Sequence, residues 1–146
     1  MNTLIAFVGI LCGFAIVLYF IFFRTKTDAR VKELAILAYA CAGKIAGLPA
    51  KGSPPSVNLK ARRWDNNGVL VIGNYKWFKF FNKVIWDRIL VVNNPKNIWP
   101  NLVHEMTHAV RRRAGKSSRE KAAEAAEAKA NELITPEVAE QLEVFK

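Results

Sequence analysis

The sequence predicts an α+β protein: a long apolar helix, then a small β-sheet, then two or three helices. Residues 4–23 contain no charged side chain, residues 57–92 are rich in β-branched and aromatic residues, and helix signals follow from Pro100 onward. A chain of 146 residues accommodates one core of ordinary size. With 51% hydrophobic and 23% charged residues it is not a disordered tail, and two cysteines exclude a disulfide-rich scaffold.

The N-terminal segment Leu4–Phe23 has twenty uncharged residues. As a helix it measures roughly 30 Å, the thickness of the bilayer hydrocarbon core. It lacks the basic region and small-residue cleavage site of a signal peptide. Nine basic and two acidic residues follow within 24–63. We therefore expect residues 1–23 to form a transmembrane anchor of a single-pass membrane protein whose C-terminal domain is cytoplasmic.

A second helix is predicted over residues 28–47, with Asp28 at its start and Gly47 at its end. The Pro-, Gly- and Ser-rich residues 49–56 form a loop. These signals divide the chain into the anchor, a basic juxtamembrane helix and linker over 24–56, and a domain over 57–146. We expect the basic residues of 24–63 to contact anionic headgroups at the membrane surface.

Strands are predicted at 69–72, after the turn signal Asn66-Asn67-Gly68, and at 84–92. The next helix begins near Pro100 and stops near Gly115. Residues 117–120 read Ser-Ser-Arg-Glu, a capping box that opens a helix rich in Ala, Glu and Lys. Thr135-Pro136 marks the start of a short terminal helix.

The segment His104-Glu105-Met106-Thr107-His108 matches the pattern H-E-x-x-H and contains both histidines of the chain. On a helix, residues four apart share a face, so both imidazoles can bind one Zn²⁺ ion. Glu105 can then act as the general base on a zinc-activated water. The pattern predicts a metal centre that hydrolyses a carbonyl compound.

Two histidines leave a catalytic zinc ion one protein ligand short. The carboxylates on the next helix are the remaining candidates, because an antiparallel helix pair brings that helix over the first one. Glu127 is favoured, Glu124 is second and Glu120 stays open, since the loop length between the helices decides among them. Asn131 is a candidate for orienting one of the histidines.

The HEMTH segment with a glutamate on the following helix resembles the zincin metallopeptidases of gluzincin type. The spacing to Glu127 is similar to that of gluzincin aminopeptidases. The tail from Glu124 to Pro136 weakly resembles the ImmA/IrrE family, in which the glutamate ligand falls nearer Glu124. The resemblance implies a zinc peptidase domain, in which the apolar segment 89–92 is the edge strand that aligns the substrate.

A transition-state stabiliser is normally a His, Tyr or Arg near the metal. Both histidines are already assigned as ligands, so Tyr75, Arg111 and Arg112 are the candidates. The two arginines lie seven and eight residues after His104, on or beside its face. They also suit a solvated helix end, where cations are favourable.

The sequence thus predicts a membrane-anchored zinc metallopeptidase acting on a protein or peptide substrate. Two alternatives remain open. One is a phage-type cell-wall peptide hydrolase. The other is a non-catalytic, membrane-tethered protein that binds a protein or nucleic acid. Nucleic-acid binding is the weaker interpretation, because the clusters Arg62-Arg63 and 111–113 occur without a nucleic-acid motif.

Overall fold

The fold is α+β, with a small mixed sheet covered by helices. The computed structural model describes residues 2–23, 27–60, 72–80 and 83–145. In these residues the elements are α1 (Asn2–Phe23), a 3-10 turn η1 (Ala29–Val31), α2 (Lys32–Ala46), β1 (Ser56–Lys60), β2 (Gly73–Phe80), β3 (Lys83–Val92), α3 (Ile98–Arg113), α4 (Glu120–Ala130), a 3-10 turn η2 (Asn131–Leu133) and α5 (Pro136–Glu143). The predicted strand at 69–72 falls outside the described residues except at Ile72, and the turn at 66–68 and Arg62-Arg63 fall outside them.

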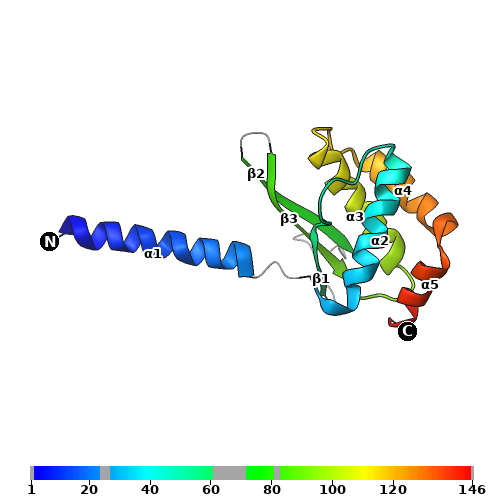
Figure 1. The fold of residues 1–146 in the computed structure, drawn as a ribbon, viewed down its shortest axis with the longest axis horizontal. Coiled ribbons are helices and arrows are strands. Elements are labelled where there is room, and N and C mark those ends of the chain that lie inside the picture. The colour runs from blue at the N-terminus through cyan, green and yellow to red at the C-terminus, as the bar shows by residue number, and fades with distance from the viewer. Residues whose placement is uncertain (1, 24–26, 61–71, 81–82, 146) are drawn as a thin grey trace.

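The prediction of a transmembrane anchor is wrong. Among the described residues, no helix combines the length and the apolar character that crossing a membrane requires. Figure 1 shows α1 extending away from the sheet and the other helices. The predicted single-pass location with a cytoplasmic domain depended on that anchor and is corrected with it. The predicted contacts of the basic segment with anionic headgroups stay a prediction.

The second predicted helix is present as η1 and α2. Asp28 caps its start by accepting a hydrogen bond from the Arg30 backbone N–H at 3.1 Å. Gly47 ends α2 with a φ of 62°, a left-handed conformation that favours glycine. The apolar face of α2 lies in the same core as α3. Helix α2 therefore packs with the elements of the predicted 57–146 domain.

The sheet has the strand order β1-β3-β2. Strand β1 is parallel to β3, and β2 is antiparallel to it, with Tyr75 opposite Ile89. The longest strand, β3, is thus central, and β2 lies at the edge. Figure 1 shows helices α2 to α5 on one side of this sheet. The edge of β2 that does not pair with β3 lies next to the helices.

The core lies between the sheet and α3, and between α3 and its neighbours α2 and α4. Ile89 and Val91 of β3 and Leu102 and Met106 of α3 are fully buried. Helix α4 contacts this core through three small residues, Ala123, Ala126 and Ala130. Because alanine adds little bulk, the axis of α4 can approach α3 closely. The polar residues of α4 are thereby brought to the face of α3 that carries the histidines.

Candidate metal centre

Helix α3 presents two histidines on one face. His104 and His108 are four residues apart, so they are neighbours on the helix surface. Their Nε2 atoms lie 3.3 Å apart, and their side chains are 13% and 12% exposed. The residues on the opposite face, such as Val103 and Met106, are fully buried in the core. Core packing therefore fixes the direction in which the two imidazoles point.

Glu120, the first residue of α4, completes a group of three metal-ligating side chains. Its Oε1 lies 3.0 Å from His104 Nε2, and its Oε2 lies 3.3 Å from His108 Nε2. The three ligand atoms lie within 4.8 Å of one another and could hold a metal ion. Two nitrogens that bind zinc tetrahedrally at about 2.0–2.1 Å are themselves about 3.3 Å apart. The spacing of the imidazoles fits such an ion.

The chemistry of the ligand set also fits a divalent ion. Two imidazoles and one carboxylate are a known combination at catalytic zinc sites, where three protein ligands leave one position open. Burial, followed by the effect of His104, lowers the pKa of His108. The neutral imidazole, which is the form that binds metals, is therefore retained to lower pH.

The Nδ1 atom of each imidazole contacts a polar side chain on the side away from the metal-ligating group. His104 Nδ1 lies 2.8 Å from Glu127 Oε2, and His108 Nδ1 lies 2.5 Å from Ser118 Oγ. A hydrogen bond at Nδ1 fixes the orientation and the tautomer of a ligating histidine, which leaves Nε2 free for the metal. The structure thus contains an inner group of three ligands and an outer pair that orients them.

The candidate carboxylates of α4 have separate positions. Glu120 lies in the metal-ligating group, whereas Glu127, the favoured candidate, lies behind His104. Glu124 is exposed and outside the group. Asn131 is exposed at the C-terminal end of α4, where its backbone N–H bonds the Lys129 carbonyl. Asn131 was predicted to orient one of the histidines, but Glu127 contacts His104 Nδ1 and Ser118 contacts His108 Nδ1 instead.

The predicted capping box is wrong, and its residues serve the site instead. The N-cap of α4 is Arg119, without a side-chain cap hydrogen bond. Ser118 contacts His108, and Glu120 contacts both histidines. Sequence reasoning missed Ser118 for this reason: a serine before a helix is most simply interpreted as a cap.

Glu105 lies beside the metal-ligating group and is 7% exposed. Its carboxylate accepts a hydrogen bond from the Tyr75 backbone N–H. Burial is the main cause that raises the pKa of Glu105 to about 7. A Cβ at position 73 would lie 2.5 Å from Glu105 Oε1, so the close approach of β2 requires Gly73. An isolated glycine in a strand pattern is the sequence signal for such an approach.

Two cavities flank the metal-ligating group. One has a volume of about 340 Å³ and the other of about 260 Å³. Gly73, His104, Glu105 and Glu120 line both of them. Because they share these walls, the cavities form two halves of one groove that passes the predicted metal position. This groove can admit an extended ligand on both sides of the metal.

Strand β2 forms one wall of the groove, whereas 89–92 was predicted to be the edge strand. That prediction is wrong, because β3 lies between β1 and β2. The Val92 N–H donates to the Ile72 carbonyl at 2.9 Å, which makes these residues a hydrogen-bonded pair. Such pairs alternate along an antiparallel ladder, so the main-chain groups of Gly73 and Tyr75 face away from β3. They face the groove, as the bond from Tyr75 to Glu105 requires.

The three candidate stabilisers of the transition state are in different surroundings. The Tyr75 hydroxyl donates to Asp87 Oδ2 at 3.0 Å, and burial raises its pKa well above the usual range. Arg111 Nε donates to the Ser117 carbonyl at 2.9 Å. Arg112 alone of the two arginines lines the larger cavity. Among the described residues that line the groove, Arg112 is the only arginine or lysine.

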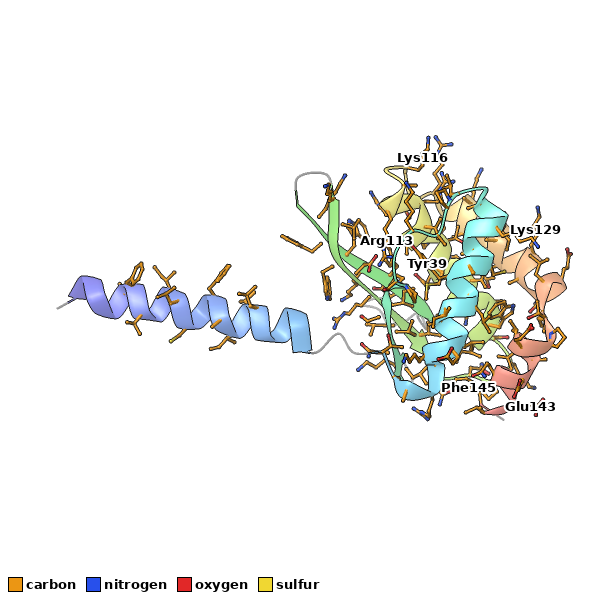
Figure 2. All side chains as sticks on the ribbon, viewed as in Figure 1. Tyr39, Arg113, Lys116, Lys129, Glu143 and Phe145 are labelled. Carbon is orange, nitrogen blue, oxygen red and sulfur yellow. The ribbon has the colours of Figure 1, made fainter. Side chains whose placement is uncertain are left out.

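Arg113, which sequence reasoning did not single out, links four segments beside the site. Its guanidinium donates to both carboxylate oxygens of Asp87 at 2.6 and 2.8 Å and to the Tyr39 hydroxyl at 3.1 Å. It also donates to the Lys51 and Ser53 carbonyls. Figure 2 shows Arg113 and Tyr39 lying together between the sheet and α2. No local sequence pattern indicates this network, because its members are far apart in the chain.

Comparison of the chain with protein-family models, with curated proteins and with solved structures gave no match. The class of site is accordingly defined by its geometry: a group of two histidines and one glutamate that could hold a metal ion, in an open groove.

Proposed function

We propose that this chain is a zinc-dependent peptide hydrolase. His104, His108 and Glu120 would bind the ion, and Glu105 would be the general base. The observation that carries the proposal is the position of Glu105. It lies buried beside the three side chains that could hold a metal ion, in a groove along the edge of β2 that pairs with no other described strand.

The proposed roles follow from the positions of the side chains. Zinc supplies a Lewis acid that lowers the pKa of water and polarises a carbonyl group. Glu105 would take a proton from the attacking water as the C–O bond forms, and would then deliver it to the amide nitrogen, so that the C–N bond breaks and the amine leaves. Its hydrogen bond from the Tyr75 backbone N–H keeps the carboxylate aimed at the groove. Glu127 and Ser118 hold the histidines in orientation.

An extended peptide is the substrate shape that the groove favours. The outward-facing main-chain groups of Gly73 and the Tyr75 carbonyl offer positions at which a further strand can pair with β2, while the Tyr75 N–H bonds Glu105. The groove is open at both cavities, so chain can continue on both sides of the cleaved bond. A binding function with a purely structural zinc is less favoured, because structural sites close the ion with four protein ligands.

Zinc content tests the metal site. The full chain is expected to bind about one zinc ion. His104→Ala and Glu120→Ala should abolish stoichiometric binding, whereas Glu127→Ala should weaken zinc affinity about 10–100-fold, as expected for an orienting partner. Glu124→Ala, on the same helix but outside the group, is the matched control. Zinc loss in Glu124→Ala with retention in Glu120→Ala would contradict the assignment.

Cleavage of unstructured peptides tests the activity. Glu105→Gln is nearly isosteric and is expected to retain zinc while losing at least 100-fold in kcat, the usual contribution of a general base. Persistent activity in this variant would exclude the mechanism. A folded, zinc-loaded parent that cleaves no member of a mixed peptide library would exclude the peptidase function.

A further inference from the structure

Arg112 has a supported position in the wall of the larger cavity. It lies one helical turn beyond His108, and its guanidinium carbon is 4.3 Å from the centre of the Trp77 ring. Trp77 stacks on Tyr75 with ring centres 5.5 Å apart and an interplanar angle of 13°. Tyr75 is itself fixed by its hydroxyl bond to Asp87. This stack holds the Arg112 guanidinium beside the groove.

Within the described residues, the neighbouring arginines have hydrogen-bond or ion-pair partners, whereas the Arg112 guanidinium has its contact with the Trp77 ring. Arg111 bonds the Ser117 carbonyl, and Arg113 forms an ion pair with Asp87. In the part of the chain that the structure describes, no carboxylate lies within ion-pair distance of Arg112, and its Nε is buried without a hydrogen-bond partner. A guanidinium stacked on an aromatic face keeps its in-plane N–H groups available. Their fork geometry matches a planar carboxylate.

The charges of the two halves of the groove differ. Glu105 and Glu120 line both cavities, and a divalent ion bound at the group offsets their two negative charges. Of the described lining residues, Arg112 then remains as the uncompensated charge of the larger cavity, whereas Glu127 lines the smaller one. An anionic group is therefore favoured in the larger cavity and disfavoured in the smaller one.

We propose that Arg112, stacked on Trp77, binds a carboxylate of the substrate, so that the enzyme prefers peptides with an anionic group on this side of the cleaved bond. The inference rests on the proposed peptidase function and names its substrate class. The carboxylate belongs either to the C-terminus of the peptide or to an Asp or Glu side chain. Both present the same planar anion to the guanidinium.

Binding is measured on the full, zinc-loaded chain carrying Glu105→Gln, so that no probe is consumed. Three N-acetylated alanine tetrapeptides serve as probes in isothermal titration calorimetry: a free acid, its C-terminal amide, and an amide with one internal glutamate. At least one anionic peptide is expected to bind 10-fold or more tightly than the neutral amide, the effect of one charge-assisted hydrogen-bond pair. The stronger of the two anionic peptides identifies the source of the carboxylate.

Substitutions assign the preference to Arg112. Arg112→Gln in the same background should remove it, and Arg112→Lys, which keeps the charge but loses the planar fork, should reduce it severalfold. Lys129→Gln is the charge-matched control, because Lys129 is exposed on α4, outside both cavities, where Figure 2 shows it pointing outward. Zinc content and circular dichroism confirm that each variant is folded. If Arg112→Gln fails to fold, the peptide preference of Arg112→Lys tests whether Arg112 binds the carboxylate.

Three outcomes would overturn the proposal. The first is equal binding, or no binding, of the three peptides. The second is a preference that survives in Arg112→Gln or, with that variant unfolded, is undiminished in Arg112→Lys. The third is an equal loss of kcat for neutral and anionic peptides when Arg112→Gln is made in the active chain, which would indicate transition-state stabilisation. A carboxylate preference in a chain that cleaves no peptide would leave this site standing and exclude only the peptidase function.

Discussion

Glu105 combines two properties that a surface carboxylate lacks: burial and a main-chain donor. The first raises the pKa of the carboxyl to about 7, and the second favours the ionised form but does not offset the burial. A group with such a pKa is protonated and deprotonated within the physiological range. Gly73 makes this environment possible, because the Cβ of any other residue there would lie 2.5 Å from Glu105 Oε1 and force the side chain to shift.

The raised pKa of Glu105 predicts how stability depends on pH in the metal-free chain. Below pH 4.5 the carboxyl is protonated in both the folded and the unfolded chain, so it costs nothing. As the pH rises from 4.5 to about 7, the unfolded chain ionises first, and folding loses on the order of 3 kcal/mol at 1.36 kcal/mol per pKa unit. Above pH 7 the loss is complete and constant.

Urea denaturation of the wild type and of Glu105→Gln in the presence of a chelator measures this effect. The stability difference between the two chains should change in favour of the glutamine variant between pH 4.5 and 7. Glu124→Gln, a substitution of an exposed glutamate, should show no such change. A difference that is constant with pH, or that favours the wild type as the pH rises, would contradict the assigned pKa.

At the scale of elements, the pair α3 and α4 builds the site. Helix α3 supplies both histidines and Glu105, and α4 supplies Glu120 and Glu127. Small residues let α4 approach, and one buried hydrogen bond fixes it: Trp99 Nε1 donates to the Ala130 carbonyl at 2.8 Å. That carbonyl lies at the C-terminal end of α4, where the helix has no further intrahelical donors.

Trp99→Phe is expected to loosen α4 without emptying the core. The substitution leaves the Ala130 carbonyl buried without its partner, which should cost about 1–3 kcal/mol of stability. Because Glu120 and Glu127 are carried by the same helix, zinc affinity should fall together with stability. Thermal denaturation with and without zinc measures both effects. Unchanged zinc affinity in a destabilised variant would show that the α4 position is set elsewhere.

At the scale of the whole molecule, the Arg113 network joins the parts that surround the groove. It connects α3 to β3 through Asp87, to α2 through Tyr39, and to the loop after α2 through main-chain carbonyls. Asp87 also holds Tyr75, which belongs to the groove wall. The network thus couples the position of the edge strand to the helix that carries the histidines.

Removing only one partner of the Arg113–Asp87 ion pair is expected to lower the stability of the fold. Arg113→Met leaves Asp87, which is 7% exposed, as a buried carboxylate without its cation, and should lower the free energy of unfolding by about 3–5 kcal/mol. The double variant Asp87→Asn/Arg113→Met removes both charges and should recover part of that loss. Chemical denaturation of the three chains tests this. An equal or larger loss in the double variant would mean that the ion pair is not the main contribution.

The spacing of apolar residues along the chain predicted the elements whose formation depends on residues close in sequence. The helix over 28–47, the strand at 84–92 and the helix with its histidines on one face were predicted from spacing and terminal residues. The predicted ligands His104 and His108 lie together because residues four apart on a helix always do. Glu105 follows from the same geometry. The apolar composition of residues 4–23, in contrast, predicted a membrane span that the described residues do not contain.

Only the tertiary structure decided the features that join distant segments. Whether Glu120, Glu124 or Glu127 meets the histidines depends on the turn after Gly115 and on how closely the alanines of α4 approach α3. Which strand borders the groove depends on the order β1-β3-β2, and a strand's own sequence does not encode its neighbours. The sequence alone therefore predicted which side chains of α3 lie together, through contacts within one helix. The position of Glu120 beside the histidines, the groove and the position of Arg112 came from packing, because they depend on contacts between elements.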